Sequence, residues 1–243
     1  MGILNGKKLS KVRNSMKKMW RLILCVFILA VGMTGCLEKN NIEPKVTASV
    51  SIYHSSPDAP ELNIIMDKVV INLQAFKYKN YSNYLEVEAG IRNFRFNAYS
   101  TGTNLVETNF DFEANKVYSL FVMNTLSRIE LLRTVDVSDP PASGNARVRF
   151  IHLSPDAPEI DIIWGGETTP VFSGQIFKQA SAFKDVPAKT YSMQVKVKGG
   201  SGITLVVPDV QIKEAGYFTI LVEGFDILPA NNANALSARV IGN

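Results

Sequence analysis

Cysteine is nearly absent from this chain of 243 residues. Its two cysteines, Cys25 and Cys36, lie close to the N-terminus, and none follows Cys36. The sequence beyond Cys36 therefore cannot form a disulfide, a zinc–thiolate site or a cysteine nucleophile.

Patterns that bind metals or cofactors are also lacking. The chain has two histidines, one in each half, and one His in each half cannot make the closed four-ligand nitrogen/sulfur site that is typical of zinc. Calcium takes roughly six to eight oxygen ligands, and no loop clusters Asp and Asn in that way. No Gly-rich phosphate loop or dinucleotide-binding pattern occurs. We expect no metal and no cofactor.

Acidic residues are missing from the first 35 positions, which carry seven Lys and Arg. Residues 22–34 are an apolar run of 13, shorter than the ~20 residues of a membrane-spanning helix and typical of a signal peptide. The run closes on Met33-Thr34-Gly35-Cys36, which resembles the lipobox of bacterial lipoproteins, with Met33 where the pattern prefers Leu. The resemblance implies a signal peptide at 1–35 and a lipidated Cys36. A simple membrane anchor and a secreted protein cleaved elsewhere are the alternatives.

The residue after the cysteine and the charge balance bear on location and partners. Leu37, rather than Asp, follows Cys36, which in lipoprotein sorting resembles an outer-membrane signal of a Gram-negative cell. Acyl chains such as palmitate would then hold the protein on the periplasmic or the outer face. Seven of the 26 Lys and Arg precede Cys36, which leaves 19 against 22 Asp and Glu. A mature chain of net charge about −3 has no basic field for nucleic acid.

One eight-residue motif occurs twice, at His54–Glu61 and at His152–Glu159. Seven of its eight positions are identical at an offset of 98 residues, and the two copies hold both histidines of the chain. Identity of this length at one offset indicates an internal duplication. The chain is therefore interpreted as two copies of one module.

The duplication and the linker composition define five segments. A signal peptide (1–35) and a lipidated cysteine with a flexible tether (36–47) precede the first repeat (48–138), a linker (139–145) and the second repeat (146–243). The linker is rich in Pro, Gly and Ser, as domain boundaries are. Because it has little apolar content, we expect the repeats to fold independently.

Hydrophobic residues alternate with polar ones in both repeats. Phe94, Phe96 and Ala98 alternate with polar neighbours, and residues 191–197 do the same. This period of two is typical of half-buried strands, and six to eight short strands per copy predict an antiparallel sandwich. Gly165-Gly166 marks a tight hairpin in the second copy, where the first has Asp67-Lys68. The fold class is therefore all-β, with two tandem β-sandwiches.

Several segments of the second repeat resemble the domain-of-unknown-function family numbered 4397. They are Arg147–Pro158, Ile160–Ile162, Val186–Tyr191 and Glu214–Thr219. The resemblance spans nearly all of the second repeat. The first repeat fits less tightly, with Asn63 in place of an acidic residue and Asp67-Lys68 in place of a Gly-containing turn. The resemblance implies an immunoglobulin- or transthyretin-like sandwich in an exported bacterial protein, and implies no activity.

The repeated motif has a structural interpretation and three functional ones. Its two prolines end the preceding strand, so the motif forms a corner. The residues that can stabilise this corner by hydrogen bonds are His54, Ser56 and Asp58 in the first copy and His152, Ser154 and Asp156 in the second. The alternatives are a recognition surface at the end of the sandwich, a metal site, and a Ser-His-Asp hydrolase site. We favour the structural corner, because both copies retain the motif.

Two groups of aromatic residues suggest either a carbohydrate-stacking platform or core packing. They are Phe76, Tyr78, Tyr81 and Tyr84 in the first repeat, and Trp164, Phe172 and Phe177 in the second. Taken together, the sequence predicts a cell-envelope lipoprotein that acts as a non-enzymatic binding, adhesion or structural module. Its partners would be the membrane and an envelope protein or glycan. An accessory glycan-binding protein and an envelope hydrolase are the alternatives, and the oligomeric state stays open.

Overall fold

The structure, a computed structural model, describes residues 45–137, 139–200 and 205–242. The signal peptide, Cys36 and most of the tether lie outside these residues. Within the described ranges, no helix is long and apolar enough to cross a membrane.

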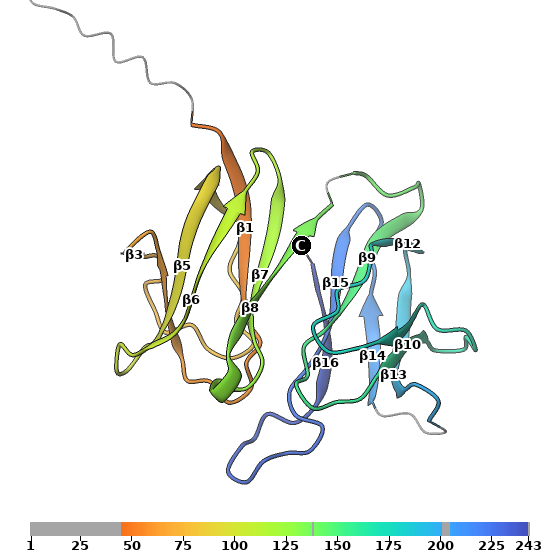
Figure 1. Ribbon diagram of the computed structural model, residues 1–243. Coiled ribbons are helices and arrows are strands. Elements are labelled where there is room, and N and C mark those ends of the chain that lie inside the picture. Colours follow the sequence, from red (N-terminus) through yellow and green to blue (C-terminus); the bar gives the residue numbers. More distant parts are fainter. Residues whose placement is uncertain (1–44, 138, 201–204, 243) are drawn as a thin grey trace, which may run out of the picture. The chain divides into compact units, whose positions relative to one another are not determined.

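The predicted fold class is confirmed, because the described chain is all-β and forms two sandwiches (Figure 1). The first sandwich contains β1 (Thr47–His54), β2 (Leu62–Met66), β3 (Val69–Val70), β4 (Leu85–Glu88), β5 (Gly90–Ala98), β6 (Asn104–Phe112), β7 (Val117–Met123) and β8 (Glu130–Asp136). The second contains β9 (Asn145–His152), β10 (Ile160–Trp164), β11 (Phe172–Gln175), β12 (Lys184–Pro187), β13 (Thr190–Val197), β14 (Leu205–Gln211), β15 (Tyr217–Glu223) and β16 (Ser237–Gly242).

The two sandwiches share one topology. The first has sheets of order β4-β1-β7-β8 and β3-β2-β5-β6, and the second has the corresponding orders β12-β9-β15-β16 and β11-β10-β13-β14. Each strand of the first repeat therefore has a counterpart eight strands later.

Alternation along the strands produces a separate core in each sandwich. Phe94, Phe96 and Ala98 of β5 are buried, and Tyr191 and Met193 of β13 are buried in the same way. Successive side chains of a strand point to opposite faces, so these residues line the space between the two sheets. The central strands β1, β7, β9 and β15 are buried along most of their length, because a second surface also covers them.

The pairing departs from a purely antiparallel sandwich in one respect. Strand β1 runs parallel to β7, with Ser49 opposite Val117 and His54 opposite Val122, and β9 runs parallel to β15. A period of two shows which face of a strand is buried but says nothing of its direction. The short strands β4, β11 and β12 have four residues each and were not predicted.

The hairpins after β2 and β10 differ. Asp67 and Lys68 form a two-residue turn, with Met66 directly opposite Val69 and positive φ angles of 47° and 73°. Gly165-Gly166 makes a tight turn, closed by the hydrogen bond from Glu167 N to Trp164 O. The partner strand β11 begins only at Phe172, so the short hairpin predicted for the second copy is a longer loop.

A third apolar cluster joins the two repeats, and Lys45–Asn243 form one compact unit. The cluster consists of Tyr53, Phe121 and Met123 from the first repeat and Ile151, Leu153, Leu221 and Ile241 from the second. These residues lie on the outer faces of the sheets that contain β1 and β9. We call this contact between the repeats the seam. The linker composition did not reveal it.

Candidate functional site

Both histidines of the repeated motif are fully buried and make the same contact. Nε2 of His54 lies 3.1 Å from Pro60 O, and Nε2 of His152 lies 3.1 Å from Pro158 O. A carbonyl oxygen can only accept, so Nε2 carries the proton and donates it. Nδ1 of each ring has no hydrogen-bond partner. Burial lowers the pKa of His54 to about 4 and also lowers that of His152.

The motif aspartates hold the loops that follow the parallel neighbours of β1 and β9. Oδ1 of Asp58 accepts a hydrogen bond from Leu126 N at 2.7 Å. Asp156 accepts two, from Asp226 N and Ile227 N, both at 2.9 Å. Each aspartate satisfies backbone N–H groups that would otherwise lack a protein partner.

The motif serines complete the two corners. The Ser56 hydroxyl donates to Asn124 O at 2.6 Å, and the Ser154 hydroxyl donates to Asp156 Oδ1 at 3.3 Å. The corner motif therefore ties the end of one strand to the loop after the next strand of the same sheet. All six predicted motif residues lie in these two corners.

The three chemical groups of a hydrolase triad do not face one another in either corner. Nε2 of His152 donates a hydrogen bond to Pro158 O, whereas the Ser154 hydroxyl bonds to Asp156 and not to the His152 ring. A general base needs a hydrogen bond to its nucleophile, either directly or through one water. Among the residues that the structure describes, no group of three or more His, Cys, Asp or Glu could hold a metal ion.

The aromatic residues of the first repeat do not form one exposed row. Phe76 is buried and packs against His54, and Tyr78 meets the same ring edge-on. Tyr81 is 48% exposed and stacks on Tyr53. These three rings therefore each pack against another ring of the fold, whereas Tyr84 lies beside Asp136.

The aromatic residues of the second repeat belong mostly to its core. Trp164 is buried against Tyr191, with ring centroids 4.3 Å apart. Phe172 is buried beside Phe150, and Phe177 packs edge-on to His152 at the seam cluster. These positions fit the core-packing alternative better than a stacking platform.

A buried ion pair crosses the seam. Nη2 of Arg149, on β9, lies 2.7 Å from Oδ1 of Asp136, at the end of β8, and the two side chains are 2% and 3% exposed. The guanidinium also donates to the hydroxyls of Thr219, Thr134 and Ser119 at 2.9, 3.0 and 3.2 Å. Charges buried this deeply are stable only with such partners. The sequence signal for this site was weak, because β9 holds a second arginine, Arg147, and the spacing does not tell which of the two is buried.

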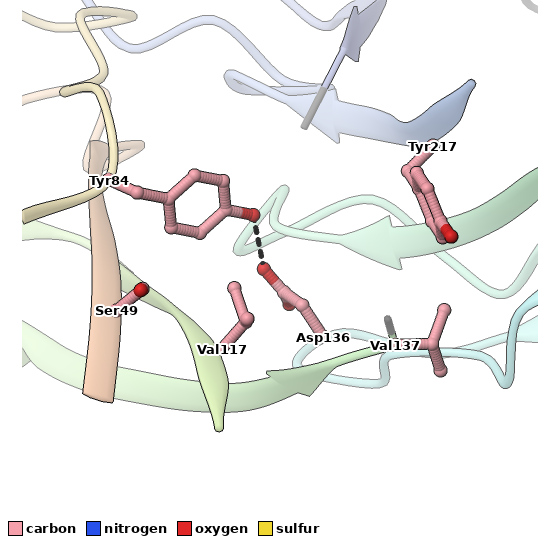
Figure 2. A pocket seen from close by; sticks show the side chains of 6 residues that line it. All are labelled: Ser49, Tyr84, Val117, Asp136, Val137 and Tyr217. Atoms are coloured by element: carbon pink, nitrogen blue, oxygen red, sulfur yellow. Dashed lines mark hydrogen bonds between the residues drawn. The ribbon is translucent and has the colours of Figure 1, made fainter. Parts of the chain in front are cut away.

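A cavity of about 250 Å³ lies beside Asp136, the acidic member of this ion pair (Figure 2). It is lined by Ser49, Tyr84, Val117, Asp136, Val137 and Tyr217. The first five belong to the first repeat or its junction with the linker, and Tyr217 begins β15 of the second. We call it the seam cavity.

Hydrogen bonds fix the polar side of the seam cavity. The Tyr84 hydroxyl donates to Asp136 Oδ2 at 2.6 Å, as Figure 2 shows, and the Ser119 hydroxyl donates to the same oxygen at 2.7 Å. Burial and the Asp136 charge raise the pKa of Tyr84, so its hydroxyl stays protonated. The Ser49 hydroxyl donates to Glu86 at 2.8 Å. The corner motif did not indicate this cavity, and of the aromatic residues named from the sequence Tyr84 lines it.

The fold and the seam define a class: an all-β protein of two coupled sandwiches with a cavity between them. Residues 48–163 match the model of a family described as Domain of unknown function (DUF4397), which supports the family that the sequence resembles. The match covers the first repeat, where we expected the weaker fit, and continues into β10 of the second. A search of curated proteins finds no match.

Two solved structures are similar to the chain at low scores. One is CBMbc, of carbohydrate-binding module family 26, from Eubacterium rectale Amy13K in complex with maltoheptaose. It has a TM-score of 0.25 and 10% identity, and the alignment covers 80% of this chain and 97% of that one. The other is a candidate cell adhesion protein from Bacteroides fragilis, with a TM-score of 0.20 and 10% identity, covering 82% and 97%. At these scores neither likeness carries an argument about function.

Proposed function

We propose that this chain is a lipoprotein of the bacterial outer membrane that binds a small ligand in the seam cavity without chemical conversion. Cys36 carries the acyl chains, and the envelope location follows from the lipobox-like sequence and Leu37. From Cys36 to Lys45 the chain reaches at most about 30 Å, at roughly 3.3–3.6 Å per residue. The sandwiches therefore work close to the membrane surface.

The seam cavity is the observation that carries the binding role. Ligand sites form preferentially between domains, where two rigid surfaces enclose a concave space. Here the apolar seam cluster and the Arg149–Asp136 pair hold the two walls together before any ligand arrives. A preformed site avoids the cost of ordering its walls on binding.

The corner motif is better explained by structure than by catalysis. His54 and His152 are buried, and the Nε2 of each ring donates a hydrogen bond to a backbone carbonyl. The hydrolase alternative would require one of these rings to turn toward a nucleophile and break that bond. The corner as a recognition surface remains an alternative at Asp58 and Asp156.

Ligand screening of the purified chain tests the binding role. Neutral sugars, amino acids and short peptides are added while tyrosine ring resonances are followed by NMR. A ligand of the seam cavity should shift Tyr84 and Tyr217 and leave the exposed Tyr99 unchanged. The proposal fails if no compound shifts the two cavity tyrosines, or if every compound that binds perturbs only His54 and His152.

Fractionation of cells tests the location. A multiply acylated Cys36 would anchor the chain, because each buried methylene contributes ~0.8 kcal/mol and stable anchoring takes more than one chain. The Cys36→Ser variant should leave the membrane fraction and take up no labelled fatty acid, whereas Cys25→Ser should behave as the native chain does. A Cys36→Ser variant that still pellets with label overturns the lipoprotein assignment.

A further inference from the structure

The chemistry of the seam cavity restricts the ligand that it can take, and this inference rests on the proposed binding function. The volume of about 250 Å³ lies just below the ~300–1,000 Å³ typical of sites for drug-sized ligands. A single six-membered ring with its substituents suits such a space better than an extended molecule. Because the cavity is partly open to solvent, that ring can belong to a longer chain.

The ion pair beside the cavity argues against a charged ligand. Asp136 is the charged side chain that lines the cavity, and Arg149 neutralises it at 2.7 Å. An anion would find no uncompensated cation among the lining residues, and a cation would have to compete with the guanidinium. Desolvating an ion without a partner is costly. The ligand is therefore neutral.

The hydrogen bonds already made around the cavity determine its polarity. The Tyr84 hydroxyl donates its hydrogen bond to Asp136, and the Ser49 hydroxyl donates its hydrogen bond to Glu86. Each hydroxyl has one proton, so toward a ligand both oxygens can only accept. A ligand that satisfies them must supply donors, and a neutral ring supplies these as hydroxyl groups.

The remaining walls are apolar. Val117 and Val137 line the cavity with aliphatic side chains, and Tyr84 and Tyr217 line it with aromatic side chains, one from each repeat. A pyranose matches this combination, because its C–H face packs on aromatic rings while its hydroxyl edge donates hydrogen bonds. We propose that the seam cavity binds a single neutral hexose unit of a glycan, with Tyr84 and Tyr217 as the stacking residues.

Calorimetric titration of the purified full-length chain tests this ligand class. The probes are maltoheptaose, cellohexaose and mannohexaose, which are neutral hexose oligomers of different linkage. We expect at least one to bind, and we expect Tyr217→Ala to weaken that binding about tenfold through the lost stacking. Tyr99→Ala, which removes a tyrosine that is 43% exposed and does not line the cavity, should leave the affinity unchanged.

A second variant is needed because Tyr217→Ala could lose binding through a folding defect. Val137→Trp fills the cavity from a loop position and leaves the side chains of Arg149 and Asp136 unaltered, so it should abolish binding while the thermal midpoint stays native. Binding that survives Val137→Trp overturns the seam assignment. If none of the three oligosaccharides binds while another compound shifts the cavity tyrosines in the NMR screen, the hexose proposal is wrong and the binding function stands. If no compound of any class binds, both are wrong.

Discussion

At the scale of single residues, the corner motif places polar side chains where the backbone needs partners. Asp156 accepts two loop N–H groups, and Asp58 accepts one. The buried histidines add a hydrogen bond to a proline carbonyl in each copy. The sequence already indicated a corner stabilised by these residue types, but the loops that they hold lie about 70 positions away and could not be identified.

Removing the aspartate of a corner should lower stability. We expect Asp156→Ala to reduce the free energy of unfolding by about 0.5–2 kcal/mol, the range for lost capping groups, because two N–H groups lose their acceptor. His152→Ala, and the matched changes at His54 and Asp58, should act in the same direction. Urea denaturation of the full chain measures each effect, with Asp156→Asn, which keeps one acceptor oxygen, as the control. If the alanine variants unfold at the native urea midpoint, the structural role of the corner is wrong, and the corner is better interpreted as a binding surface.

The buried histidines should also make stability depend on pH. The pKa of His54 is about 4 in the folded chain, against 6.5 for a free histidine. Between these pH values the unfolded chain binds the extra proton, so the free energy of unfolding falls as pH falls from 6.5 to 4 and is insensitive to His54 above 6.5. At 1.36 kcal/mol per pKa unit the loss approaches 3 kcal/mol.

Comparison with His54→Gln isolates this contribution from the carboxylates. The variant should be less stable at pH 7 and should lose less stability between pH 6.5 and 4 than the native chain does. Urea denaturation at several pH values provides the measurement. Equal slopes for the two proteins would mean that His54 titrates normally in the folded state.

At the scale of strands and turns, the period of two located most of the sheet correctly. Strands β5 and β13 lie where alternating residues predicted them. The parallel pairing of β1 with β7 was missed, because direction depends on how the chain crosses between sheets. Short strands such as β11 were missed because four residues contain too little alternation to recognise.

The two-residue turn after β2 provides a test at this scale. Lys68 adopts a φ of 73°, which costs a side-chain-bearing residue energy that glycine avoids. We expect Lys68→Gly to raise the free energy of unfolding by about 0.5–1 kcal/mol. Lys68→Ala, which keeps the Cβ, should give no such gain. Thermal unfolding of the native chain and the two variants measures these differences in stability. A glycine variant less stable than the native chain would contradict the turn geometry.

At the scale of the whole molecule, the seam converts two similar modules into one unit with a cavity that neither contains alone. Its apolar cluster and its ion pair both draw on residues from each repeat. The envelope location that we propose rests on residues outside the described part, above all Cys36.

Breaking the ion pair on one side should be more damaging than replacing it. Arg149→Leu leaves Asp136 buried without its counter-charge, at a cost of about 3–5 kcal/mol. The double variant Arg149→Leu, Asp136→Asn should recover much of this loss, because Asn can still accept from Tyr84 and Ser119. Denaturation of both single variants and the double variant forms a thermodynamic cycle. Additive losses would show that the pair does not act as a unit.

The second repeat should still fold by itself, though less stably. A fragment of residues 146–243 has a complete two-sheet core, so it should give a β-type circular dichroism spectrum and a cooperative thermal transition. It exposes Ile151, Leu153, Leu221 and Arg149, and its midpoint should therefore lie below that of the full chain. A disordered spectrum that recovers only when residues 48–138 are restored would show that the repeats depend on each other.

Local patterns of spacing and alternation in the sequence were enough to predict the duplication, the all-β class and most of the strands. The lipid anchor is also predicted from a local pattern, of charge and apolar length, and stays a prediction. Tertiary structure alone decided the parallel pairs, the loops held by Asp58 and Asp156, and the seam. Asp136 and Arg149 are 13 residues apart and Tyr84 and Tyr217 are 133 apart in the printed sequence. Such residues meet only when two folded surfaces bury their apolar faces together, and no local pattern encodes which surfaces those are.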